Sequence, residues 1–373
     1  MLGYYSSMVG LQKNLLGFNL KGVPSGVYTS NTVTYTSTID PSINDLYLGY
    51  SYDTGWTNLP ICLVMHGWNQ SASTYYGEIT ERIASYGYFA ISVGMRGRDG
   101  ASGARDGSAR ELYDIYDAIQ YIKSSFNTIV NGDSIVACGW SGGGGNAYGF
   151  VSKFPDLCQV LVSNFGMSDY GYDVTDGWYY TNTASYGASI VSSIGVITDK
   201  NTYRARYAIE QISNFKGYSY IFHDEDDATV DVINSQNMHL ALTNNHEYIE
   251  TTAIDDPRWI HQTPTGVRPI TEAEQIWKNK IFTQKNKIVS KIGAIKVNGY
   301  VVTKRFTIWL GDGVASADNG TNRTATVDYN TITGEYDVTP IFEGSATDCE
   351  VIITQGGLSK TQTITTQTIL TVT

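Results

Sequence analysis

The pentapeptide Gly139-Trp140-Ser141-Gly142-Gly143 constrains the fold more than any other stretch of this chain. It follows the apolar run 134–138, and further small residues follow it. This pattern is typical of a strand, a sharp turn and a helix, with the serine at the tip of the turn. The glycines let strand and helix approach each other, and the helix N-terminus can stabilise an oxyanion. The pentapeptide therefore predicts a nucleophilic serine, and the alternative is a plain Gly/Ser-rich turn.

The composition excludes several classes of protein. The 373 residues predict one large domain and a smaller one. With 36 acidic and 25 basic residues the net charge is −11, which argues against a nucleic-acid-binding protein. The four cysteines are widely spaced, so they predict buried thiols and no zinc site. We therefore predict no metal and no cofactor.

The N-terminal segment 1–20 lacks both the basic and the apolar part of a cleavable secretion signal. No segment reaches the roughly 18 apolar residues that span a bilayer. The expectation is a chain without a membrane span that is cytoplasmic or virion-associated.

Strand-like and helix-like segments alternate along most of the chain. Continuous apolar runs at 60–65 and 88–93 indicate central strands that are covered on both faces. Residues 112–122 carry apolar side chains at helical spacing. The alternation predicts an α/β fold with a mostly parallel sheet and helices on both faces.

The composition changes near residue 288. From there on, many threonines and short alternating runs predict a small C-terminal all-β Ig-like sandwich. The predicted organisation is an N-terminal arm at 1–30, an α/β domain at 31–287 with an aromatic insertion at about 170–208, and a β module at 288–373. We expect few contacts to cross the boundary and the module to be separable from catalysis.

The segment from His223 to Val230 follows a predicted strand. Here the chain resembles the alpha/beta-hydrolase superfamily, in the branch of prolyl oligopeptidase-like and dienelactone hydrolase-like enzymes. These enzymes commonly carry His-Gly-x-x-Asp-x-x-Val at this point. This chain has Asp224 in place of the glycine, whereas Asp227 and Val230 keep their offsets from His223. The resemblance covers roughly residues 45–283 and extends to His66-Gly67-Trp68, the loop that starts at Arg96, the pentapeptide, Lys153-Phe154-Pro155-Asp156 and residues 162–166.

A catalytic serine needs an imidazole to accept its proton and a carboxylate to orient that imidazole. The family order of serine, acid and histidine implies Ser141 as nucleophile, Asp227 as acid and His261 as base. His261 lies in the loop after the last predicted strand, and His246, which opens that strand, is the alternative base. The rival acids are the neighbouring carboxylates Asp224, Glu225 and Asp226.

The resemblance also implies an oxyanion hole made by the backbone N–H groups of Gly142 and Trp68. Aromatic faces pack well against sugar rings, so Trp140, Trp178 and Tyr179 are candidate substrate contacts. Core packing is the alternative for these side chains. Three arginines, Arg96, Arg98 and Arg105, could bind an acidic substrate, and structural ion pairs are their alternative.

The predicted reaction is acyl transfer to water on a small-molecule or polysaccharide ester, with carbohydrate acyl esters as one class. An ester is preferred because only about 45 residues precede the first matched strand, too few for the propeller of a prolyl oligopeptidase. One alternative is a serine peptidase of that type. The other is an attachment protein of a phage virion or cell-surface assembly that retains the fold and binds a larger assembly through its C-terminal module or N-terminal arm.

Overall fold

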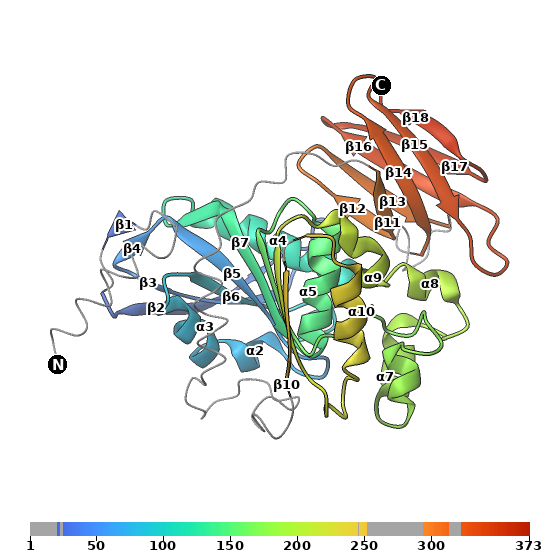
Figure 1. The fold of residues 1–373 in the computed structure, drawn as a ribbon. Helices are drawn as coiled ribbons and strands as arrows, with labels where there is room; N and C mark the ends of the chain where they lie inside the picture. Colours follow the sequence, from blue (N-terminus) through green and yellow to red (C-terminus); the bar gives the residue numbers. More distant parts are fainter. Residues whose placement is uncertain (1–20, 23–24, 245, 252–293, 313–321) are drawn as a thin grey trace.

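The computed structural model describes residues 21–22, 25–244, 246–251, 294–312 and 322–373 (Figure 1). These residues form a large sheet with helices on both faces and a separate pair of smaller sheets near the C-terminus. No helix in these ranges is long and apolar enough to cross a membrane.

The large sheet has eight strands in the order β10-β9-β8-β7-β5-β6-β3-β2. Its strands are β2 (Tyr28–Tyr35), β3 (Leu46–Asp53), β5 (Leu59–Met65), β6 (Phe89–Val93), β7 (Val130–Trp140), β8 (Val160–Asn164), β9 (Tyr218–Asp224) and β10 (His246–Thr251). In this order all pairings from β10 to β6 are parallel, and β3 pairs antiparallel with both β6 and β2. This order confirms the predicted α/β-hydrolase fold. A short pair, β1 (Lys21–Gly22) and β4 (Trp56–Thr57), lies beside it.

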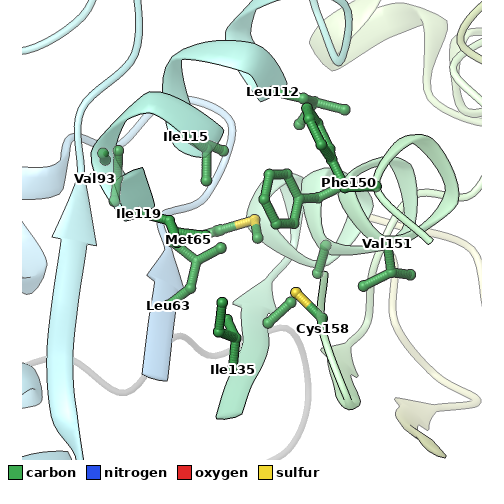
Figure 2. Packing of buried hydrophobic residues seen from close by; sticks show 14 of the residues in the cluster. Leu63, Met65, Val93, Leu112, Ile115, Ile119, Ile135, Phe150, Val151 and Cys158 are labelled. Atoms are coloured by element: carbon green, nitrogen blue, oxygen red, sulfur yellow. The ribbon is translucent and has the colours of Figure 1, made fainter. Parts of the chain in front are cut away.

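Helices cover both faces of this sheet, and three others, between residues 178 and 204, lie in the insertion after β8. They are α2 (Ala72–Tyr75), α3 (Glu78–Ala84), α4 (Arg110–Ser125), α5 (Gly142–Lys153), α6 (Trp178–Thr181), α7 (Thr183–Ile194), α8 (Lys200–Arg204), α9 (Ala208–Gln211), the 3-10 helix η1 (Ile212–Asn214) and α10 (Ile233–Ala241). Leu63 and Met65 of β5 point toward α4 and α5, where Ile119 and Phe150 meet them (Figure 2). The alternate β5 residues, Cys62 and Val64, pack on the opposite face with α2 and α3. All of β5 is buried, as its continuous apolar sequence predicts.

The predicted domain limits are only partly within the described residues. Strand β2 begins at Tyr28, so the sheet starts inside the segment 1–30 that we expected to be an arm. The predicted boundary at 287/288 lies outside the described residues.

The C-terminal module is an antiparallel β-sandwich, as predicted. One sheet has the order β11-β14-β15-β18 and the other β12-β13-β16-β17. The strands are β11 (Ile295–Asn298), β12 (Tyr300–Val302), β13 (Phe306–Gly311), β14 (Thr324–Asn330), β15 (Glu335–Ile341), β16 (Cys349–Gln355), β17 (Leu358–Ile364) and β18 (Thr368–Thr371). Apolar side chains from both sheets, such as Val297 and Ile353, form one shared core.

The expectation that few contacts join the module to the α/β domain is wrong. Tyr300 of β12 is fully buried, packs with Phe154 of the α/β domain, and belongs to the same apolar cluster as the sheet core. Its hydroxyl donates to the carbonyl of Ala109 at 2.9 Å, and its own carbonyl accepts from Gln211 at 3.0 Å. The Lys153 ammonium donates to the carbonyl of Asn298 and lies 4.8 Å from the centre of the Tyr300 ring. The module therefore completes the core of its neighbour.

Candidate active site

Ser141 lies in the turn between β7 and α5, as the pentapeptide predicts. Its backbone is strained, with φ 55° and ψ −122°, in a region that residues with a Cβ rarely adopt. The Ser141 N–H donates to the carbonyl of Asn164 at 3.0 Å, and the Ser141 carbonyl accepts from Gly145 at 3.0 Å. Strain that is held in place by the surrounding backbone is typical of a functional site.

The glycines around Ser141 are required by the close approach of neighbouring backbone. A Cβ on Gly139 would lie 2.0 Å from the carbonyl oxygen of Gly143, and one on Gly143 would lie 2.0 Å from that of Met65. A Cβ on Gly142 would lie 2.4 Å from the backbone nitrogen of Trp68. The two backbone segments that we predicted to supply the oxyanion hole are therefore in contact.

Two buried side chains hold the loop that carries Trp68. The Arg98 guanidinium donates to the carbonyl of Trp68, and its Nε lies 3.6 Å from Oε1 of Glu111. Burial raises the pKa of the Glu111 carboxyl, and the nearby Arg98 opposes this effect. Arg96 likewise pairs with Asp114 at 2.6 Å. Arg96 and Arg98 thus follow the structural alternative, and sequence reasoning did not identify Arg98 as an anchor of this loop.

The loop that carries Asp227, here called the acid loop, follows β9 and is closed by its own hydrogen bonds. Oδ1 of Asp227 accepts from the N–H groups of Thr229 at 2.8 Å and Val230 at 3.0 Å. Oδ2 lies 3.4 Å from Nε2 of His223, which also lies 2.8 Å from the carbonyl of Val230. Because that carbonyl can only accept, Nε2 carries the proton. His223 therefore anchors the loop, which explains its fixed offset from Asp227.

The rival carboxylates differ in burial. Glu225 and Asp226 are exposed, whereas Asp224 and Asp227 are buried at 0% and 6% exposure. Asp224 is the last residue of β9, and its Oδ1 accepts from the N–H of Asp226 at 2.9 Å.

Of the two candidate bases, the structure describes only His246. His261 lies outside the described residues. His246 pairs with Ser219 at the start of β9, at the opposite end of the sheet from Asp224. Its ring nitrogens contact His239 at 2.8 Å and the carbonyl of Asn244 at 2.9 Å. Active-site loops of open parallel sheets gather at the carboxyl ends of the strands, so the position of His246 argues against it as the base.

The aromatic insertion forms a cap, residues 170–208, that contains α6, α7 and α8. Trp178 is buried, its Nε1 donates to the carbonyl of Thr229 at 2.9 Å, and its ring packs edge-on against Trp68 at 5.5 Å. Trp140 is buried beside Tyr75 at 6.0 Å. Both tryptophans are thus buried, whereas Tyr179 is half-buried, and a substrate contact stays a prediction for all three side chains. Within the described ranges, no group of three or more His, Cys, Asp or Glu side chains could hold a metal ion.

Two solved peptidase structures support the fold. The acylaminoacyl peptidase of Pyrococcus horikoshii has a TM-score of 0.51 at 16% identity, over 65% of this chain and 43% of that chain. A candidate dipeptidyl aminopeptidase IV from Bacteroides ovatus has a TM-score of 0.54 at 17% identity, over 69% and 36% of the two chains. An esterase of Pyrococcus furiosus has a TM-score of 0.49 at 16% identity, over 68% and 89%. This chain thus spans less than half the length of the two peptidases.

Comparison with sequences gives the family. No curated protein sequence matches the chain significantly. The sequence profile of the prolyl oligopeptidase family matches residues 79–282, a range that contains the turn at Ser141 and the acid loop at Asp227. Because the match covers more than half of the 373 residues, this chain belongs to the prolyl oligopeptidase family.

Proposed function

We propose that this chain is a serine hydrolase that transfers an acyl group from an ester to water. Ser141 attacks the carbonyl carbon and His261 accepts its proton, while Asp227 orients His261. The alcohol leaves with a proton from His261, and water then hydrolyses the acyl-enzyme. The N–H groups of Gly142 and Trp68 stabilise the oxyanion of each tetrahedral intermediate.

The observation that carries this proposal is the strained Ser141 beside the contact between Gly142 and Trp68. A backbone that is strained at a serine and lies against a second N–H group suits a nucleophile with an oxyanion hole. Membership in the prolyl oligopeptidase family supports the same chemistry. The reaction needs neither a metal nor a cofactor.

The second candidate is hydrolysis of a peptide bond, because two of the similar structures are named as peptidases. The test compares methyl esters with amides that carry the same acyl group, and it includes labelling by a fluorophosphonate. Cleavage of the esters alone supports our proposal, whereas comparable cleavage of the amides favours the peptidase. An unlabelled, inactive chain contradicts both and favours the attachment protein.

Asp227→Asn is expected to lower kcat by about 10⁴, because the neutral amide no longer stabilises the imidazolium or selects its tautomer. The fold should survive, since the amide oxygen can still accept from Thr229 and Val230. The measurement is kcat on a short-chain ester, together with the melting temperature. The matched control is Asp226→Asn, an exposed neighbour that should behave like the wild type. A larger loss in Asp224→Asn than in Asp227→Asn would move the acid to Asp224.

Gly142→Ala is expected to lower kcat by about 10²–10³, which is the usual effect of losing one oxyanion donor. The new methyl group would lie 2.4 Å from the backbone nitrogen of Trp68 and would force the two donors apart. Gly149→Ala on the same helix is the control, because its Cβ would approach closely only the end of the Leu112 side chain, at 2.9 Å, and would lie at an ordinary 3.7 Å from Ser108. Equal kcat values for the two variants would contradict the assignment of the oxyanion hole.

A further inference from the structure

One carboxylate of the C-terminal module contacts the cap. Glu343 follows β15, and its Oε1 accepts from the hydroxyl of Tyr172 at 2.7 Å and from the guanidinium of Arg204. Its backbone is bound as well: the Glu343 N–H donates to Asn201 at 3.1 Å, and its carbonyl accepts from Asn201 at 3.0 Å. Four hydrogen bonds thus converge on one residue, which is far more than an incidental surface contact provides.

The partners of Glu343 are themselves fixed within the cap. Arg204 also pairs with Glu210 at 2.8 Å and lies 5.5 Å from the ring of Tyr172. Burial and the bond to Glu343 raise the pKa of Tyr172 to about 12, so this hydroxyl stays protonated and donates. The backbone N–H of Tyr172 is held by the buried carboxylate of Asp169 at 2.7 Å. A displacement of Tyr172 or Arg204 would therefore displace the start of the cap and α8 together.

The interior of the cap connects this contact to the active site. Tyr203, next to Arg204, is buried in one aromatic cluster with Trp68, Tyr170, Trp178 and Val230. Trp68 belongs to the oxyanion loop, and Val230 belongs to the loop of Asp227. The interior of the cap therefore packs against both loops. Each loop keeps its own anchor, Arg98 for the first and the hydrogen bonds of Asp227 for the second, so a shift of α8 changes the cap more than it changes the loops.

We infer that the C-terminal module holds the cap over the active site through Glu343, which is a positioning residue for substrate binding. This inference rests on the proposed hydrolase function. The cap supplies the wall that an extended substrate contacts, whereas a small reagent needs only Ser141 and the oxyanion hole. Loosening the cap should therefore weaken substrate binding more than it weakens the intrinsic reactivity of the serine.

The test uses the full chain with Glu343→Ala, Glu343→Gln and Tyr172→Phe, and with Asp328→Ala, an exposed acid of the same module, as control. For Glu343→Ala we expect KM for a bulky ester to rise about tenfold, while kcat and the rate of fluorophosphonate labelling stay within about twofold. Hydrogen exchange of residues 170–204 should rise in this variant. Glu343→Gln should raise KM less than Glu343→Ala does, because its amide oxygen can still accept hydrogen bonds. Tyr172→Phe should also raise KM less than Glu343→Ala does.

Three outcomes bear on whether Glu343 positions the cap. An unchanged KM and unchanged exchange of the cap in Glu343→Ala overturn the inference. A labelling rate that falls by the same factor as KM rises, together with faster hydrogen exchange throughout the chain, also overturns it. Such a result indicates general destabilisation of the protein. If the wild type is neither labelled nor active, the proposed function fails by itself, and cap exchange alone then decides whether Glu343 holds the cap.

Discussion

Ser141→Ala is expected to lower kcat for ester hydrolysis by about 10⁶ while the protein keeps its fold. The substitution removes only the hydroxyl that attacks the substrate. The strained backbone at φ 55° is equally unfavourable for serine and alanine, so the free energy of unfolding should change little. The measurements are kcat on a short-chain ester, covalent labelling by a fluorophosphonate and the melting temperature.

The control for this variant is Ser152→Ala. Ser152 lies on α5, the helix that follows Ser141; it is buried and donates to the carbonyl of Tyr148 at 2.7 Å. This variant should be labelled like the wild type. Fluorophosphonate labelling of Ser141→Ala at the wild-type rate would show that another residue is the nucleophile.

Deleting the module after Lys287 is expected to leave a chain that aggregates and has no measurable activity. The deletion removes Tyr300 from the core of the α/β domain, and loss of one such aromatic side chain destabilises by about 3–5 kcal/mol. It also leaves the buried Lys153 without its bond to Asn298, and Gln211 without its bond to Tyr300. Because a typical domain is stable by only about 5–15 kcal/mol, these losses are enough to unfold it.

Size-exclusion chromatography and thermal melting test this prediction. Tyr300→Ala in the full chain is the milder comparison and should lower the stability by about 3–5 kcal/mol. A soluble truncated chain whose kcat is within a few-fold of that of the full chain would contradict this prediction. It would support the sequence-based expectation that the module is separable from catalysis.

The features that the sequence predicted correctly are those with a local signature. Strand β5 is apolar at every position and is buried on both faces, and each glycine beside Ser141 marks a close backbone approach. The change of composition near residue 288 predicted the β-sandwich. Periodicity and turn chemistry depend on a few neighbouring residues, so they can be recognised without knowing which distant residues the segment contacts.

The features that the sequence missed depend on residues that are distant in the chain. Nothing in the sequence around Tyr300 shows that this side chain enters the core of the other domain. The sequence likewise left open whether Trp140 and Trp178 pack in the core or face a substrate, because both kinds of tryptophan look alike in a sequence. The ion pair between Arg98 and Glu111 became apparent only when the fold placed both beside Trp68.

The bond between Tyr300 and Ala109 joins residues that are 191 positions apart in the chain. On a ribosome that adds about 5–20 residues per second, the second partner is synthesised roughly 10–40 s after the first. Once Phe154 and Gln211 have also been synthesised, the nascent α/β domain exposes the apolar site until Tyr300 fills it. Co-translational folding should therefore reach its last cooperative step only after the module emerges, and before that step the nascent chain is a natural client for chaperones that bind apolar surface.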